Sequence, residues 1–134
     1  MKRGSILGYD LSEKNCQISY YDETKEEPVT LETAVENYQI PLILGYYNEH
    51  WVYGKEAKRL AEVQEENTIS DLYVRAVRRE KVEFAGKTRD AVWLLAKYIE
   101  LTLEGFPEIE YITFSVADTN IDMSKMLKGI GRHI

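Results

Sequence analysis

The chain has 134 residues, a net charge of −6 and one cysteine, which fits a single domain and excludes an intramolecular disulfide. Its composition, 44% hydrophobic and 30% charged, is typical of a soluble globular protein, and its acidity disfavours nucleic acid or an anionic membrane as partner. There is no apolar run near the roughly 20 residues of a membrane span, and the first residues lack a secretory-signal pattern. We therefore expect a cytoplasmic protein that binds neither nucleic acid nor membrane.

The first two predicted elements are the strands of a β-hairpin. Residues 6–10 and 17–21 have the residue pattern of strands, with turn-forming and charged residues between them. The connecting residues are Ser12, Glu13, Lys14 and Asn15. The highly charged stretch 22–27 is predicted to be an exposed turn.

Short strands and helices are predicted for the middle of the chain. Residues 41–47 form the most apolar strand candidate, and residues 51–53 return as a short strand after a turn at Asn48 and Glu49. Residues 55–64 have the pattern of an amphipathic helix.

Beyond this helix, the sequence predicts a second helical piece and a small strand. Leu72, Val74 and Val77 belong to the helical piece, which Ser70 or Asp71 would cap. The small strand comprises residues 81–84.

The strongest helix prediction covers residues 88–103. Its apolar residues recur every three or four positions, Thr88 is a suitable N-cap, and Gly105 with Pro107 would end the helix. A β-branched and aromatic strand at 111–116 and a short helix at 121–130 follow. Because a helix connects them, the last strand is expected to run parallel to an earlier one.

Together these elements predict one α/β or α+β domain over residues 1–134. Its mixed sheet would be an antiparallel three-strand meander, with residues 41–47 as third strand, extended by a parallel strand and packed by helices.

The order of the segments resembles the actin, sugar-kinase and seventy-kilodalton heat-shock chaperone superfamily. Ile6-Leu7-Gly8-Tyr9-Asp10-Leu11-Ser12 is similar to its first phosphate-loop hairpin, whose first strand ends in Asp-x-Gly-Thr. Residues 51–59 are similar to the chaperone pattern Val-Gly-x-Glu-Ala-x-Arg, and residues 111–116 to its Val-Ile-Thr-Val-Pro strand. The resemblance implies the first lobe of a ribonuclease H-like, actin-like ATPase fold.

The resemblance also implies a site for ATP and Mg²⁺ at the first hairpin. Asp10 matches the aspartate that holds the metal through water, and backbone N–H groups of Ser12, Glu13, Lys14 and Asn15 would hold phosphate. From the residues alone, Asp10 equally suits a cap of the hairpin turn, and Lys14 and Asn15 suit ordinary turn positions.

The hairpin departs from the family pattern at two positions. Ser12 replaces a glycine, and Glu13 replaces a small hydroxyl residue. A carboxylate about 4 Å from a phosphate charge is repelled by roughly 1 kcal/mol in water and by about 4 kcal/mol at an effective dielectric constant near 20. The departures favour a degenerate, non-hydrolysing scaffold or protein-interaction domain as the alternative function.

The family's nucleotide lies between two lobes, and no second Asp-x-Gly hairpin occurs here. We therefore expect the chain to be part of a longer protein, to lack the last strand of its sheet, and to have no catalytic activity alone. Its expected partners are a second lobe or another protein, or a second copy paired at the open sheet edge.

Five further groups of residues are candidate sites. The basic residues at 75–81 are a solvated surface or an anion contact, and Asp118 and Asp122 are helix caps or acids near a water-activating site. His50 and His133 have no metal-ligand spacing, and Cys16 fits a small core residue better than a nucleophile. Aromatic residues at 46, 47 and 51 would mark an interface if exposed together.

Overall fold

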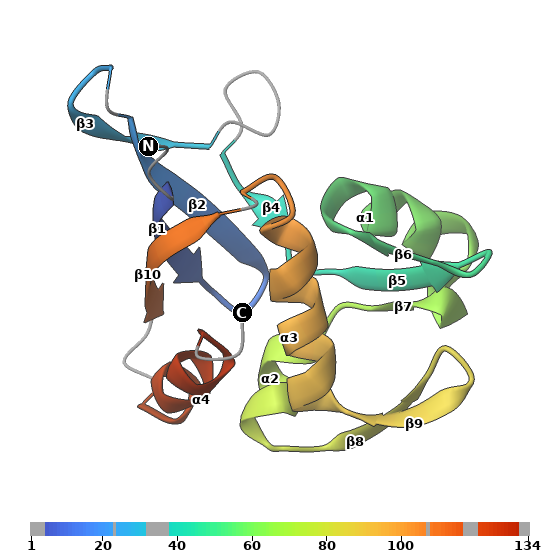
Figure 1. The fold of residues 1–134 in the computed structure, drawn as a ribbon. Helices are drawn as coiled ribbons and strands as arrows, with labels where there is room; N and C mark the ends of the chain where they lie inside the picture. Colours follow the sequence, from blue (N-terminus) through green and yellow to red (C-terminus); the bar gives the residue numbers. More distant parts are fainter. Residues whose placement is uncertain (1–4, 23, 32–37, 107, 117–120, 132–134) are drawn as a thin grey trace.

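The computed structural model describes residues 5–22, 24–31, 38–106, 108–116 and 121–131. They form an α+β structure in which a mixed sheet, a central helix and a second small sheet succeed one another (Figure 1). The expected combination of antiparallel and parallel strands with helices is confirmed.

The main sheet has the strand order β10-β1-β2-β3. Strands β1 (Ser5–Leu11) and β2 (Asn15–Asp22) form the predicted hairpin, and β10 (Ile109–Val116) runs parallel to β1 as expected. The third strand is β3 (Glu27–Thr30), so the assignment of that role to residues 41–47 was wrong. Within the charged stretch 22–27, Glu26 lies in the left-handed region (φ 54°) immediately before β3, which runs back along β2. Pro28 is tolerated there because β3 is an edge strand.

Residues 41–47 are divided between two sheets. Strand β4 (Ile40–Pro41) pairs with β2, whereas β5 (Leu44–Tyr47) pairs with β6 (His50–Tyr53) and β7 (Thr68–Ile69) in a second sheet. Apolarity alone predicts a strand, and it does not reveal that the chain leaves the main sheet after the Leu42 N–H donates to the Lys14 carbonyl at 2.8 Å.

The predicted turn at Asn48 and Glu49 is confirmed, since both have positive φ angles of 54° and 63°. Helix α1 (Gly54–Val63) and the short 3-10 turn η1 (Glu65–Asn67) lie between β6 and β7 of this second sheet. A Cβ on Gly45 would lie 2.9 Å from Val52 and 3.1 Å from Leu60. Gly45 therefore permits the close approach of α1 to one face of β5 and β6.

A second hairpin precedes the central helix. After α2 (Leu72–Val77), strand β8 (Lys81–Phe84) pairs with β9 (Lys87–Asp90) across a two-residue turn, with φ 55° at Ala85 and 77° at Gly86. Helix α3 therefore covers Ala91–Thr102, and Thr88 lies in β9 instead of capping the helix. Two successive positive φ angles favour hairpin pairing, and this overrides the helical pattern that begins at residue 88.

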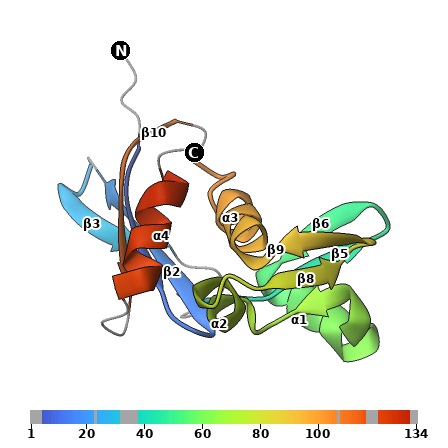
Figure 2. The same ribbon diagram turned by 90° about the horizontal axis from the view of Figure 1, so that it is seen from below.

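The main core lies between the sheet and two helices, α3 and α4 (Ile121–Gly131), which cover the same side of it (Figure 2). Leu7, Tyr9 and Leu11 point into this core, and α3 contributes Leu94, Leu95, Tyr98 and Ile99, each fully buried. The opposite face of the sheet carries exposed Ile6, Tyr21 and Tyr111. Among the described residues, none of the helices combines the length and hydropathy needed to cross a bilayer.

Candidate functional site

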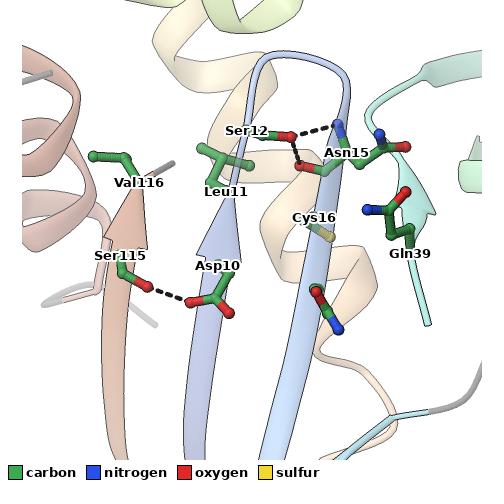
Figure 3. Close-up of a pocket in the computed structure, with 9 residues that line it drawn as sticks. Asp10, Leu11, Ser12, Asn15, Cys16, Gln39, Ser115 and Val116 are labelled. Atoms are coloured by element: carbon green, nitrogen blue, oxygen red, sulfur yellow. Dashed lines mark hydrogen bonds between the residues drawn. The ribbon is translucent and has the colours of Figure 1, made fainter. Parts of the chain in front are cut away.

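A polar pocket of about 310 Å³ lies beside the turn of the first hairpin (Figure 3). The residues that line this pocket come from both faces of the sheet. The pocket therefore lies around the ends of the strands and not on one face. The lining residues are Asp10, Leu11, Ser12, Asn15, Cys16, Gln17, Gln39, Ser115 and Val116. Ligand sites of open parallel α/β sheets occupy this place, at the carboxyl ends of the strands.

Strand register brings the polar groups of this pocket together. Asp10 lies opposite Ser115 in the parallel pair and opposite Gln17 in the antiparallel pair. The Ser115 hydroxyl donates a hydrogen bond to Oδ1 of Asp10. The other carboxylate oxygen has no hydrogen-bond partner among the residues that the structure describes. It is therefore available to a ligand.

The Ser12 side chain closes the hairpin turn. Its hydroxyl accepts from the Asn15 N–H at 3.2 Å and donates to the Asn15 carbonyl at 3.0 Å, and the Ser12 N–H donates to the same carbonyl at 2.8 Å. Of the four N–H groups expected to hold phosphate, those of Ser12 and Asn15 are therefore occupied. Those of Glu13 and Lys14 have no acceptor within the described part of the chain.

The five predicted site residues divide into two groups. Asp10, Ser12 and Asn15 line the pocket together. Glu13 and Lys14 have exposed side chains at the tip of the turn and do not line it. Because Glu13 does not line the pocket, a phosphate held at Asp10 is not placed against the Glu13 carboxylate in the way that its position in the sequence suggested.

Sequence reasoning missed Gln17, Gln39 and Ser115 as lining residues. Gln17 was recognised only as a strand residue, and Ser115 only as part of a buried strand. The alternation of strand 111–116 predicts which of its residues share a face, but the register that places Ser115 beside Asp10 is set by packing in three dimensions.

The pocket's donor set suits a hard cation. Asp10 is the one carboxylate among the lining residues, and none of them is Lys or Arg. Carboxylate, hydroxyl and amide oxygens are ligands that Mg²⁺ accepts together with retained waters. Among the described residues there is no group of three or more His, Cys, Asp or Glu side chains that could hold a metal by themselves. A cation here would therefore depend on Asp10 and water.

Cys16 belongs to the core behind the pocket. Its thiol is buried and lies 3.3 Å from the Tyr98 hydroxyl. Burial raises the pKa of the Cys16 thiol, which keeps it protonated near neutral pH. The interpretation as a small core residue is thus confirmed.

The other candidate residues lie elsewhere. Arg75 pairs with Asp71 at 2.8 Å, and Arg78 and Arg79 are exposed after α2, which fits the solvated-surface interpretation. His50 is exposed on β6. Asp118 and His133 lie outside the described residues, as does the side chain of Asp122.

Comparison with known proteins gives a family for most of the chain. Residues 25–134 match the model described as family of unknown function (DUF5716), C-terminal. No curated protein matches the chain. The match begins within the turn between β2 and β3 and covers the second sheet, α3, β10 and α4. The chain belongs to the DUF5716 C-terminal family.

Proposed function

We propose that the chain is a ribonuclease H-like, actin-like lobe that supplies one side of a Mg²⁺–nucleotide site and does not hydrolyse ATP alone. The observation that carries this proposal is the position of Asp10. It lies at the carboxyl end of β1, beside the hairpin turn and hydrogen-bonded to Ser115 of the parallel strand β10.

The topology supports the actin-like assignment. Three antiparallel strands, a helix that precedes a strand parallel to the first, and a helix after that strand follow the order expected from the resemblance. Strands β4 to β9 with α1 and α2 are then an insertion between the third strand and the central helix.

The chemistry of the pocket supports a metal-dependent mode of binding. A carboxylate without a neighbouring Lys or Arg repels a bare phosphate, so an anion alone gains little there. Bound Mg²⁺ would neutralise phosphate charge and be held by Asp10 through water. Ser115 orients the Asp10 carboxylate by donating to one oxygen. The Glu13 and Lys14 N–H groups do not line the pocket, so they would donate to a phosphate that extends past it to the tip of the turn.

Catalysis needs more than this pocket provides. Hydrolysis of a phosphoanhydride requires a positioned water and stabilisation of charge on the transferred phosphoryl group. No Lys or Arg lines the pocket among the described residues. A second lobe, on another part of a longer protein or on a partner, would have to supply those groups.

Calorimetric titration tests the proposal. We expect saturable binding of Mg-ATP, no binding of ATP in excess EDTA, and loss of binding in Asp10→Asn. Asp71→Asn is the matched control, since Asp71 is an exposed aspartate paired only with Arg75 on α2. We further expect ATP turnover by the wild-type chain to equal that of Asp10→Asn. No heat and no thermal shift at saturating Mg-ATP would refute nucleotide binding by this lobe.

A degenerate scaffold is the second candidate function. The Ser12 hydroxyl and two turn N–H groups are used within the turn, and the pocket lacks a cationic side chain. In this case β10, whose outer edge pairs with no described strand, would add a strand from a second copy. Sedimentation equilibrium would then give a dimer, together with no response to Mg-ATP.

A further inference from the structure

An aromatic–cation cluster lies on the side of α3 away from the main sheet. Four ring contacts connect it: Trp51 lies 4.9 Å from Tyr46, 6.1 Å from Phe84 and 5.9 Å from Trp93, and the Arg89 guanidinium lies 4.8 Å from the Trp93 ring. We call this set, with Lys97, the tryptophan–arginine surface. Its members are Tyr46, Trp51, Phe84, Arg89, Trp93 and Lys97.

Three separate segments build the tryptophan–arginine surface. Tyr46 and Trp51 are a cross-strand pair on one face of β5 and β6. Gly45 lies on the other face, which packs against α1. Hairpin β8–β9 contributes Phe84 and Arg89, and α3 contributes Trp93 and Lys97 one turn apart. Tyr47, which the sequence grouped with Tyr46 and Trp51, is half-exposed on the other face of β5.

Arg89 is held in one orientation. Its Nε donates to the Phe84 carbonyl at 3.3 Å, and its guanidinium also lies 5.4 Å from the Trp51 ring. Cation–π contacts with both tryptophans, together with this hydrogen bond, restrict the movement of the guanidinium. Its two terminal nitrogens have no hydrogen-bond or ion-pair partner in the described part of the chain.

Lys97 adds a second cation to the same surface. Its Nζ lies 5.8 Å from the Trp51 ring and likewise has no carboxylate partner among the described residues. A planar guanidinium with two free terminal nitrogens matches a carboxylate in a bidentate arrangement, and an ammonium beside it favours a second carboxylate. The surface thus presents positive charge on an otherwise acidic chain.

An apolar groove continues from the tryptophan–arginine surface. Trp93, whose side chain is 45% exposed, also lines a groove of about 560 Å³ between α3 and α4. Val92, Ala96, Met126 and Ile130 supply its apolar wall. The charged residues that line the groove sum to zero net charge, since there are two cations, Arg79 and Lys125, and two anions, Asp90 and Glu100.

We propose that the tryptophan–arginine surface and this groove bind an acidic, partly apolar segment of a partner protein. One carboxylate of the segment pairs with Arg89, another with Lys97, and its apolar side chains cover Trp93 and the groove. Trp and Arg side chains carry much of the binding energy at protein interfaces. A nucleic acid strand is a poorer match, because its sugar–phosphate backbone has no apolar side chains to cover Trp93 and the apolar wall of the groove. This proposal is independent of nucleotide binding.

Intrinsic fluorescence reports on this surface directly, because Trp51 and Trp93 are the two tryptophans of the chain. The probe is a tryptophan-free peptide of about 15 residues in which pairs of Glu alternate with pairs of Leu, long enough for about four helical turns. We expect a saturable emission change that weakens with added salt. A peptide with Lys in place of Glu, and a single-stranded oligothymidylate, are expected to cause none.

Variants localise the effect. Arg89→Gln and Lys97→Gln should each weaken binding about tenfold, as expected for loss of a charge-assisted hydrogen bond, and Arg89→Lys should weaken it less. Arg59→Gln, which removes an exposed arginine from α1 on the other side of the second sheet, should leave affinity unchanged. Thermal melts verify that each variant folds. If Arg89→Gln does not fold, Lys97→Gln provides the test. The proposal is overturned if the acidic peptide gives no saturable change, if Arg59→Gln weakens binding equally, or if the oligothymidylate binds instead.

Discussion

The Tyr98 hydroxyl connects three elements of the molecule. It donates to the Pro41 carbonyl at 2.9 Å and lies 3.3 Å from the Cys16 thiol, so it joins α3 to β4 and β2. Tyr98 is fully buried, and its ring meets that of Tyr53 edge to face at 6.3 Å. Tyr98 therefore links β4, from which the chain continues to the second sheet, to Cys16, which lines the Asp10 pocket on its core side.

Removing that hydroxyl should cost stability. We expect Tyr98→Phe to lower the free energy of unfolding by about 1–3 kcal/mol, because the Pro41 carbonyl and Cys16 thiol lose a buried partner. Urea denaturation followed by circular dichroism measures the change. Tyr111→Phe is the control, since Tyr111 is 63% exposed, and it should change stability by less than about 0.5 kcal/mol. Equal effects of the two substitutions would contradict this role of Tyr98.

The buried hydroxyls also make stability depend on alkaline pH. Burial raises the pKa of Tyr9 and of Tyr98 well above the ordinary 10.0. At a pH below that ordinary pKa, both tyrosines are protonated in the folded and in the unfolded chain. At a higher pH the unfolded chain loses protons that the folded chain retains, which favours unfolding. The contribution of these two tyrosines should therefore hold up to about pH 9 and then fall, by up to about 1.4 kcal/mol per pH unit for each group, and the buried Cys16 thiol, whose ordinary pKa is 9.0, adds a decline that begins about one unit lower.

Urea midpoints between neutral pH and about pH 11 measure this decline, which spans the ordinary tyrosine pKa. We expect Tyr9→Phe to make the decline shallower, because one of the suppressed ionisations is gone, even though it also loses the 2.8 Å hydrogen bond to Thr102. An unchanged slope in Tyr9→Phe would show that Tyr9 does not contribute.

At the residue scale, the sequence located Asp10 and the hairpin because a carboxylate at a strand end is a local pattern. It could not identify Ser115, whose partner is 105 positions away in the chain. It also could not show that Glu13 lies outside the pocket lining, since the conformation of a four-residue turn decides this.

At the element scale, prediction succeeded where one periodic pattern filled a segment, as in β1, β2, α1 and β10. Prediction failed where the backbone angles of one or two residues determine which secondary structure forms. Positive φ angles at Glu26 and Ala85 precede strands β3 and β9; no strand was predicted for β3, which begins where the predicted turn ends, and β9 lies where a helix start was predicted. These errors moved boundaries and strand order without changing the α+β class.

The contact between α1 and the second sheet gives a test at this scale. Gly45→Ala should lower stability by about 1–3 kcal/mol, because the new Cβ would lie 2.9 Å from Val52 and 3.1 Å from Leu60. Gly129→Ala should raise it by about 0.5–1 kcal/mol, since Gly129 lies in α4 with no atom within 4 Å of such a Cβ. Thermal and urea unfolding of both variants measure the difference. A neutral Gly45→Ala would contradict the close packing of α1 on β5.

At the scale of the whole molecule, the chain carries two distinct candidate binding regions. The Asp10 pocket lies at the strand ends of the main sheet, and the tryptophan–arginine surface lies on the far side of α3, against the second sheet. The segments that build this second region, β5, β6, β8, β9 and α3, all fall within the DUF5716 C-terminal match, as does β10 with Ser115. Asp10 and the hairpin β1–β2 precede it.

Amide resonance mapping tests the nucleotide proposal most directly. With ¹⁵N-labelled chain, Mg-ATP should shift the amides of Ser12, Glu13, Lys14, Asn15 and Ser115, and Asp10→Asn should abolish these shifts. ATP with EDTA should leave them in place, because the pocket holds a carboxylate and no cationic side chain. Shifts confined to other parts of the chain, or equal shifts with and without Mg²⁺, would contradict a Mg²⁺–nucleotide site at Asp10.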